Sequence, residues 1–180
     1  MKSAAWIAAA VVICLVGWVF FSPGGYGKDS ARRSVCLSNL KQLAIAQTVY
    51  AKDYDDRLPD RDKWMDVIAP YWKNPLPLVC PSLVKEHDPQ IYGYCFNGEL
   101  SHAKVPAQPE SVPLIFDSIN LARNASGSLD SLPVPARHLD DRNNIVYADT
   151  HAKSVRNPTP LHVSGIIFVR QEWLAALTGR

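Results

Sequence analysis

Residues 31–56, ARRSVCLSNLKQLAIAQTVYAKDYDD, form the stretch that decides the fold. Its apolar side chains recur every three or four residues, which is the spacing of one face of an α-helix. Asp29 or Ser30 can cap the N-terminus of such a helix. The positions on the apolar face are Cys36, Leu40, Leu43, Ala46, Tyr50 and Tyr54. The stretch predicts a long amphipathic helix with Arg32 and Arg33 in its first turn, where we expect phosphate or an acidic neighbour to hold them.

The C-terminal end of this helix is acidic, with carboxylates at Asp53, Asp55 and Asp56. A calcium-binding EF-hand loop would need a glycine and a distal glutamate that this segment lacks. We therefore interpret the segment as a solvated helix end closed by Pro59.

The chain changes to β character from Ile91 onward. The runs IYGYCF (91–96), PLIFDS (113–118) and NIVYAD (144–149) are short, apolar and bounded by Gly, Pro, Asn or Asp, as strands of a small antiparallel sheet are. A short amphipathic helix is predicted before them from Trp64 to Pro70, and GIIFV (165–169) could add a last strand. The predicted fold class is α+β, a long helix packed on a small antiparallel sheet.

An uncharged apolar run, AAWIAAAVVICLVGWVFF, occupies residues 4–21. As a helix it would rise ~27 Å, close to the hydrocarbon thickness of a bilayer. Trp6 and Trp18 suit the interfacial aromatic belts. A cleaved signal peptide is the alternative, but the run is longer than a usual h-region and lacks a small-x-small site after it. Residues 1–22 are therefore predicted to be an uncleaved transmembrane anchor that contacts lipid through residues 4–21.

Residues 23–29 contain a proline and three glycines, and they predict a flexible neck before one soluble domain at residues 30–180. A chain of 180 residues is long enough for one such domain but short for two. Nineteen Lys and Arg against seventeen Asp and Glu leave a formal charge of +2, which is too balanced to favour a nucleic-acid partner.

Two signals about the compartment disagree. One lysine precedes the apolar run and three basic residues follow it closely, which by the positive-inside rule would hold the domain in the cytoplasm. The soluble part also carries Cys36, Cys80 and Cys95, none of them in a CxxC pair. A bridge between two of them would indicate an oxidising compartment, whereas three buried free thiols would fit the cytoplasm.

A series of motifs in fixed order gives a family resemblance over residues 34–155. The motifs are CLSNLKQLAIAQTVYAKDYDDRLP (36–59), Trp64, PYWKN (70–74), CPS (80–82), YGY (92–94), VPLIFDS (112–118), RH (137–138) and ADTH (148–151). Together they resemble the bacterial proteins with a prepilin-type processing-associated H-x9-DG domain, a pseudopilin-like group. The resemblance implies a pilin-like domain outside the bacterial inner membrane, a structural or binding role, and partners among pseudopilin-like or type II secretion proteins.

Cysteines that match Cys36 and Cys80 are common in that family, so the resemblance implies a disulfide between them; Cys80 with Cys95 is the competing pair. The chain also departs from the family. No acidic residue precedes Asp29, ten residues rather than nine separate His138 from Asp149, and Thr150 replaces the motif's glycine.

The stretch RHLDDRNNIVYADTH (137–151) has two interpretations. In the first it is a hairpin: its strand residues alternate between two faces, the Asp149 carboxylate accepts hydrogen bonds from turn amides, and His138 bonds locally. Thr150 takes a positive φ poorly, so this hairpin is expected to use another turn. In the second, His138, Asp149 and His151 bind a divalent cation such as Zn or Ca.

These interpretations lead to different functions. The hairpin fits a structural or binding protein without a cofactor, and this is the interpretation that we favour. The metal site would make the protein a membrane-tethered, metal-dependent hydrolase. A periplasmic ligand-binding domain is a third class, with no specific residue to support it.

Overall fold

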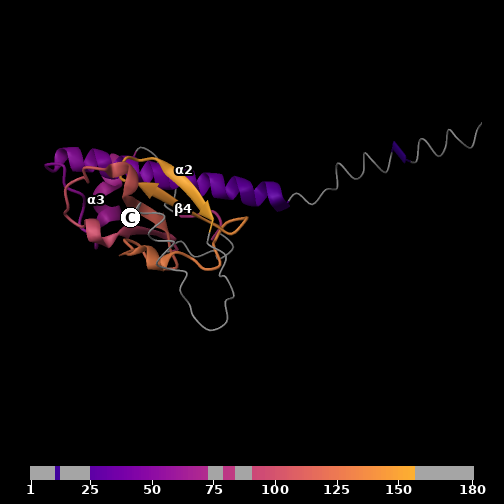
Figure 1. Cartoon of the computed structure of the whole chain (residues 1–180). Coiled ribbons are helices and arrows are strands. Elements are labelled where there is room, and N and C mark those ends of the chain that lie inside the picture. Colours follow the sequence, from indigo (N-terminus) through magenta and orange to yellow (C-terminus); the bar gives the residue numbers. More distant parts are fainter. Residues whose placement is uncertain (1–10, 13–24, 73–78, 84–90, 157–180) are drawn as a thin grey trace, which may run out of the picture.

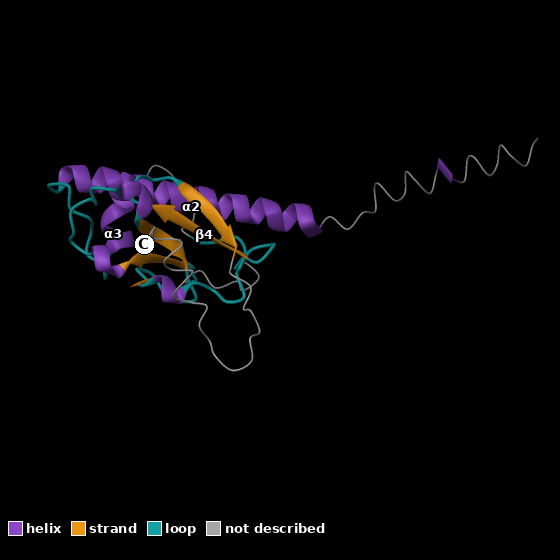
Figure 2. Ribbon diagram, in the orientation of Figure 1, coloured by secondary structure: helices purple, strands orange, loops and turns teal. Residues whose placement is uncertain are grey.

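A computed structural model of the chain describes residues 11–12, 25–72, 79–83 and 91–156. The long helix α2 (Gly25–Asp53) lies across a five-stranded sheet, and the short helix α3 (Trp64–Ile68) packs beside it (Figure 1). The strands are β1 (Tyr94–Asn97), β2 (Pro113–Asp117), β3 (Ser126–Gly127), β4 (Arg142–Tyr147) and β5 (Ala152–Arg156). The fold is therefore α+β, with helices and strands in the arrangement of Figure 2.

The sheet has the strand order β3-β1-β2-β4-β5 and is mixed rather than purely antiparallel. β1 pairs with β2, β2 with β4 and β4 with β5, all antiparallel, but β3 runs parallel to β1. The prediction of an antiparallel sheet is therefore wrong at the β3 edge. The chain reverses once between β1 and β2 and again before β3, so β3 has the direction of β1. β3 was not predicted, and β5 is the second strand of the hairpin that one interpretation placed around the Asp149 turn, although its residues were not named.

Strand β4 shows the alternation expected of NIVYAD. Val146 and the following Ala148 belong to the core beneath α2. Ile145 and Tyr147 belong to a second cluster, with Leu129 and Leu132 among its members. The sheet therefore buries both of its faces, and only the first is covered by the long helix.

Helix α2 begins at Gly25, whereas the sequence predicted a neck over residues 23–29 and a helix from Asp29 or Ser30. A single glycine inside a helix costs only about 1 kcal/mol relative to alanine, so the local glycines do not prevent the helix from forming. Arg32 and Arg33 consequently lie beyond the first turn. Both have an acidic neighbour: Arg32 bonds Asp29 at 3.1 Å, whereas Arg33 lies 3.8 Å from Asp140, too far for a hydrogen bond.

Two predicted segments lie outside the described residues. They are the apolar run 4–21, apart from the helical Val11 and Val12, and the possible strand at 165–169. Within the described ranges, no helix combines the length and the apolarity needed to cross a bilayer.

The buried face of α2 includes Ala44, Gln47 and Ala51, which the sequence pattern did not assign to it. Cys36, Leu40, Leu43 and Ala46 are buried as predicted, but Tyr54 is 51% exposed and lies beyond the end of the helix at Asp53, so its assignment to the buried face was wrong. Gln47 is fully buried too, and neither atom of its side-chain amide has a hydrogen-bond partner among the described residues. An unpaired buried amide costs about 1–3 kcal/mol, so Gln47 destabilises this part of the core.

We expect Gln47→Met to raise the free energy of unfolding by about 1–3 kcal/mol, because methionine has a similar shape and no group that needs a hydrogen bond. Chemical denaturation measures the change. Gln42→Met is the matched control on the same helix, since Gln42 is only half-buried and its amide bonds Ser38 and Trp72. A loss of stability in Gln47→Met would mean that the amide has a partner after all.

Helix α3 depends on a distant loop for its position. The Trp64 indole N–H donates to the Ala125 carbonyl at 2.9 Å, and the Met65 amide donates to the Asn124 side chain at 2.8 Å. Asn124 also donates to Asp66, and this hydrogen bond is the main cause that lowers the Asp66 pKa. The first turn of this five-residue helix is thus stabilised by tertiary contacts.

Candidate functional site

The structure does not assemble the predicted set of His138, Asp149 and His151. His138 pairs with Arg142 at the start of β4, whereas Asp149 and His151 belong to the turn after its end. A six-residue strand spans roughly 17–20 Å, so His138 lies far from the other two. The shared site fails because β4 runs straight between its candidate ligands instead of folding back.

Asp149 and His151 do contact each other. The Asp149 carboxylate accepts a hydrogen bond from the His151 amide at 3.0 Å, and it also contacts the His151 ring. Burial alone would raise the pKa of Asp149, but these hydrogen bonds hold it below its usual value. The carboxylate therefore bonds a turn amide, as the hairpin interpretation expected.

The turn itself corrects one expectation. Thr150 adopts a φ of 72°, the left-handed conformation that we expected this residue to avoid. The strain is of order 1–3 kcal/mol, and it persists where the surroundings determine the backbone. Here the Thr150 amide donates to the Tyr147 carbonyl at 2.9 Å, and the β4–β5 pairing fixes both ends of the turn.

His138 is instead part of a buried polar network at the other end of β4. Its side chain and that of Asp117, the last residue of β2, are both fully buried. The Asp117 Oδ2 atom lies 3.0 Å from the His138 Nε2 atom and accepts a hydrogen bond from the Asn144 amide at 2.6 Å. The other ring nitrogen, Nδ1, lies 3.1 Å from the Ser82 hydroxyl.

The geometry favours one tautomer of His138. Nε2 lies between the Asp117 carboxylate and the Asn144 side-chain nitrogen, which is 2.9 Å away. Hydrogen bonds to an ionised carboxylate are roughly twice as strong as neutral ones, so Nε2–H donating to Asp117 is the better arrangement. The Asn144 side-chain nitrogen then donates to the Arg33 carbonyl, 3.4 Å away, and not to His138. Nδ1 is then unprotonated and accepts from the Ser82 hydroxyl.

Arg137 supplies the positive charge of the network. Its guanidinium lies 3.5 Å from Asp117 and donates to the Gly93 carbonyl at 2.7 Å and to the Ser118 carbonyl. Burial lowers the pKa of Arg137, and the Asp117 charge opposes that effect. Burial also raises the pKa of the Tyr94 phenol, with a further contribution from Asp117. The Arg137 and Asp117 charges compensate each other away from water.

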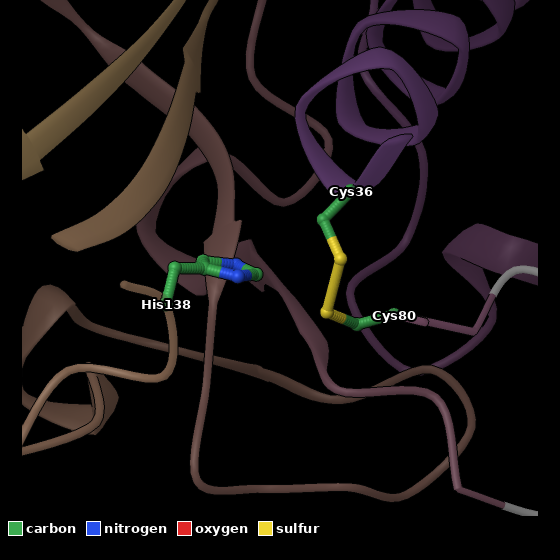
Figure 3. A group of neighbouring side chains, drawn as sticks. All are labelled: Cys36, Cys80 and His138. Atoms are coloured by element: carbon green, nitrogen blue, oxygen red, sulfur yellow. A yellow bond between two sulfur atoms is a disulfide. The ribbon is translucent and has the colours of Figure 1, made fainter. Parts of the chain in front are cut away.

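A disulfide lies beside this network. Cys36, on α2, is bonded to Cys80, which precedes β1, and the Cα atoms are 5.1 Å apart. Figure 3 shows the His138 ring extending toward the bridge. Cys95 is a buried free thiol, so the structure has the first of the two disulfide pairings considered from the sequence. The bridge joins α2 to the loop that contains Cys80 and Ser82. His138 contacts Ser82 in this loop and Asp117 and Asn144 in the sheet, so it links the loop to the sheet.

The series Ser82, His138 and Asp117 has the donor and acceptor order of a nucleophile, a base and an orienting carboxylate. The His138 side chain is fully buried, however, and within the described part of the chain its ring nitrogens contact Ser82, Asp117 and Asn144. A substrate could reach this base only after the body opened. The arrangement as it stands can hold segments together and fix a histidine tautomer.

Sequence reasoning identified His138 but not Asp117, Ser82, Arg137 or Asn144 as its partners. The available signal was the resemblance, since the RH, FDS and CPS motifs bring most of these residues into the series of matched segments.

No family model matches the chain, and neither the curated proteins nor the solved structures include a match to it.

Proposed function

We propose that this protein is a membrane-anchored, pseudopilin-like structural or binding protein of the bacterial cell envelope. In this proposal residues 1–22 anchor it in the inner membrane, with lipid contact through residues 4–21, and the domain that follows lies on the extracytoplasmic side. Its partners are other pseudopilin-like proteins or components of a type II secretion or pilus-like system.

The disulfide between Cys36 and Cys80 is the observation that carries the proposal. Disulfides persist in oxidising spaces and are rare in the cytoplasm, so the bridge favours the extracytoplasmic side over the orientation that the basic residues suggest. It also links α2 covalently to the rest of the domain, as expected of a structural protein in that space. The motif series and the helix-on-sheet arrangement support the same protein class.

The surroundings of His138 favour a structural role over the metal-dependent hydrolase. Asp149 and His151, its predicted co-ligands, pair with each other at the far end of β4. His138 itself bonds Asp117 within the core. Each of these side chains thus has an identified partner that contributes to folding.

The test is the topology and the thiol count of the full chain in bacterial cells. After acid quenching, denaturation and alkylation, we expect two of the four cysteines to react before reduction and all four to react after it, because one bridge protects two. Protease added to spheroplasts should digest the domain while a cytoplasmic marker stays intact. Four reactive thiols before reduction, together with a domain that external protease does not reach, would contradict the proposal.

A further inference from the structure

We propose that the reduced form of this chain binds zinc, or a similar divalent transition metal, through Cys36, Cys80 and His138. The disulfide and the metal would be alternative states of one site, because both use the same two sulfur atoms. The inference is independent of the membrane anchor and of the proposed partners. It rests on the side chains that Figure 3 shows.

The three ligand atoms already lie close together. The two sulfur atoms and a ring nitrogen of His138 are all within 4.8 Å of one another, and all three residues are buried. A tetrahedral zinc ion with bonds of about 2.0–2.3 Å separates its ligand atoms by about 3.3–3.8 Å. Once the S–S bond is broken, the sulfur atoms need only small side-chain movements to reach such positions. Two thiolates and one imidazole are a ligand set that suits zinc.

His138 is oriented as a metal-binding histidine would be. Metal ligands of this kind commonly donate their second ring N–H to a carboxylate, which fixes the tautomer and the ring. Asp117 occupies that position, 3.0 Å from Nε2. Nδ1 faces the hydroxyl of Ser82, two residues after Cys80, and is therefore the nitrogen on the side of the cysteine turn. The Ser82 hydroxyl would supply an oxygen ligand for the remaining position.

The charges of the site also fit a divalent cation. Two thiolates neutralise its two positive charges, and the neighbouring Arg137 is already compensated by Asp117. The metal complex would then be neutral in a region from which water is excluded. A buried neutral complex avoids the large cost of burying an unpaired charge.

The change of state balances in two steps. A reductant of the dithiol or phosphine class donates two electrons to the bridge, the S–S bond breaks, and Cys36 and Cys80 become thiols. A phosphine takes up the oxygen of one water molecule and becomes a phosphine oxide, while the two hydrogens of the water go to the thiols. The metal ion then displaces the two thiol protons, so that binding releases two protons and should weaken as the pH falls.

The experiment uses the full chain in mild detergent, reduced with a water-soluble phosphine without oxygen and titrated with Co²⁺. We expect one Co²⁺ per chain with a sulfur-to-cobalt charge-transfer absorption, and displacement of the cobalt by one equivalent of Zn²⁺. The oxidised chain should show no such absorption. Cys95→Ser is the matched control, because it removes a buried thiol outside the site and should leave the titration unchanged.

Three variants test the ligands. Cys36→Ser, Cys80→Ser and His138→Gln should each weaken Co²⁺ binding at least tenfold, with circular dichroism to compare their folding with that of the reduced wild type. The cysteine variants are well matched to that reference, since none of these forms contains the bridge. The inference fails if the reduced wild type gives no charge-transfer absorption at stoichiometric cobalt. It also fails if both cysteine variants bind as tightly as the reduced wild type, whether or not His138→Gln folds.

Discussion

Asp117→Ala should lower the free energy of unfolding by about 3–5 kcal/mol, the loss expected when one partner of a buried ion pair is removed. The Asp117 carboxylate is fully buried and compensates the charge of Arg137. It also accepts hydrogen bonds from His138 and from the Asn144 amide. Alanine would leave three donors without this acceptor in a space that water does not reach. Urea denaturation of the oxidised full chain, followed by circular dichroism, measures the loss.

Two variants show whether charge and burial cause that loss. Asp117→Asn keeps the shape of the side chain but not its charge, so it should also destabilise the fold by leaving Arg137 uncompensated. Lys52→Ala removes the exposed ion pair with Asp56, whose charged atoms are 2.7 Å apart, and should leave the free energy of unfolding nearly unchanged, because water screens the pair. If Asp117→Ala cost no more than Lys52→Ala, the buried network could not have the stabilising role assigned to it here.

Sequence reasoning could identify His138, in the segment RHLDD, as a candidate site residue, but it could not predict the contacts of His138 in the buried network. β2 is buried along its whole length, from Pro113 to Asp117, so its sequence shows no alternation that would mark Asp117 as an inward-facing residue. The sequence alone therefore predicts only that Asp117 ends a strand. Its partner His138 is 21 residues away, and only the sheet register brings the two together.

The long helix was more predictable than its limits. Cys36, Leu40 and Leu43 repeat at the helical period, and packing against the sheet buries them as that period requires. The start of the helix was misplaced because glycines lower helix propensity only modestly, and a long helix can include them. Gln47 was missed because a polar side chain at a buried position contradicts the pattern from which burial is predicted.

The turn at Thr150 shows a different limit. Propensity argues against a positive φ at threonine, yet the structure has 72° there. Strand pairing on both sides and the hydrogen bonds of Asp149 determine the backbone, and together they outweigh a local cost of a few kcal/mol. A single-residue preference is thus a weak guide where two strands already fix the geometry.

Replacing both bridged cysteines should have an effect as large as that of Asp117→Ala, but by a different mechanism. Cys36 and Cys80 are 44 residues apart in the sequence, and closing a loop of that length stabilises the fold by about 4 kcal/mol in the chain-entropy model. We therefore expect Cys36→Ala/Cys80→Ala to lose about this much in urea denaturation of the oxidised full chain. Most of the loss arises because the unfolded chain gains freedom, and less of it because native contacts disappear.

That mechanism can be tested with reductant. In a phosphine and a metal chelator, the wild type has neither bridge nor metal, so its stability should fall to nearly that of the double variant. If the free energies of unfolding of the wild type and the double variant still differed by about 4 kcal/mol under these conditions, the effect would instead come from packing around the sulfur atoms. Cys95→Ala is an independent control for the loss of packing around a buried sulfur atom. It removes a buried sulfur but leaves the bridge intact, and should cost only about 1 kcal/mol with or without reductant.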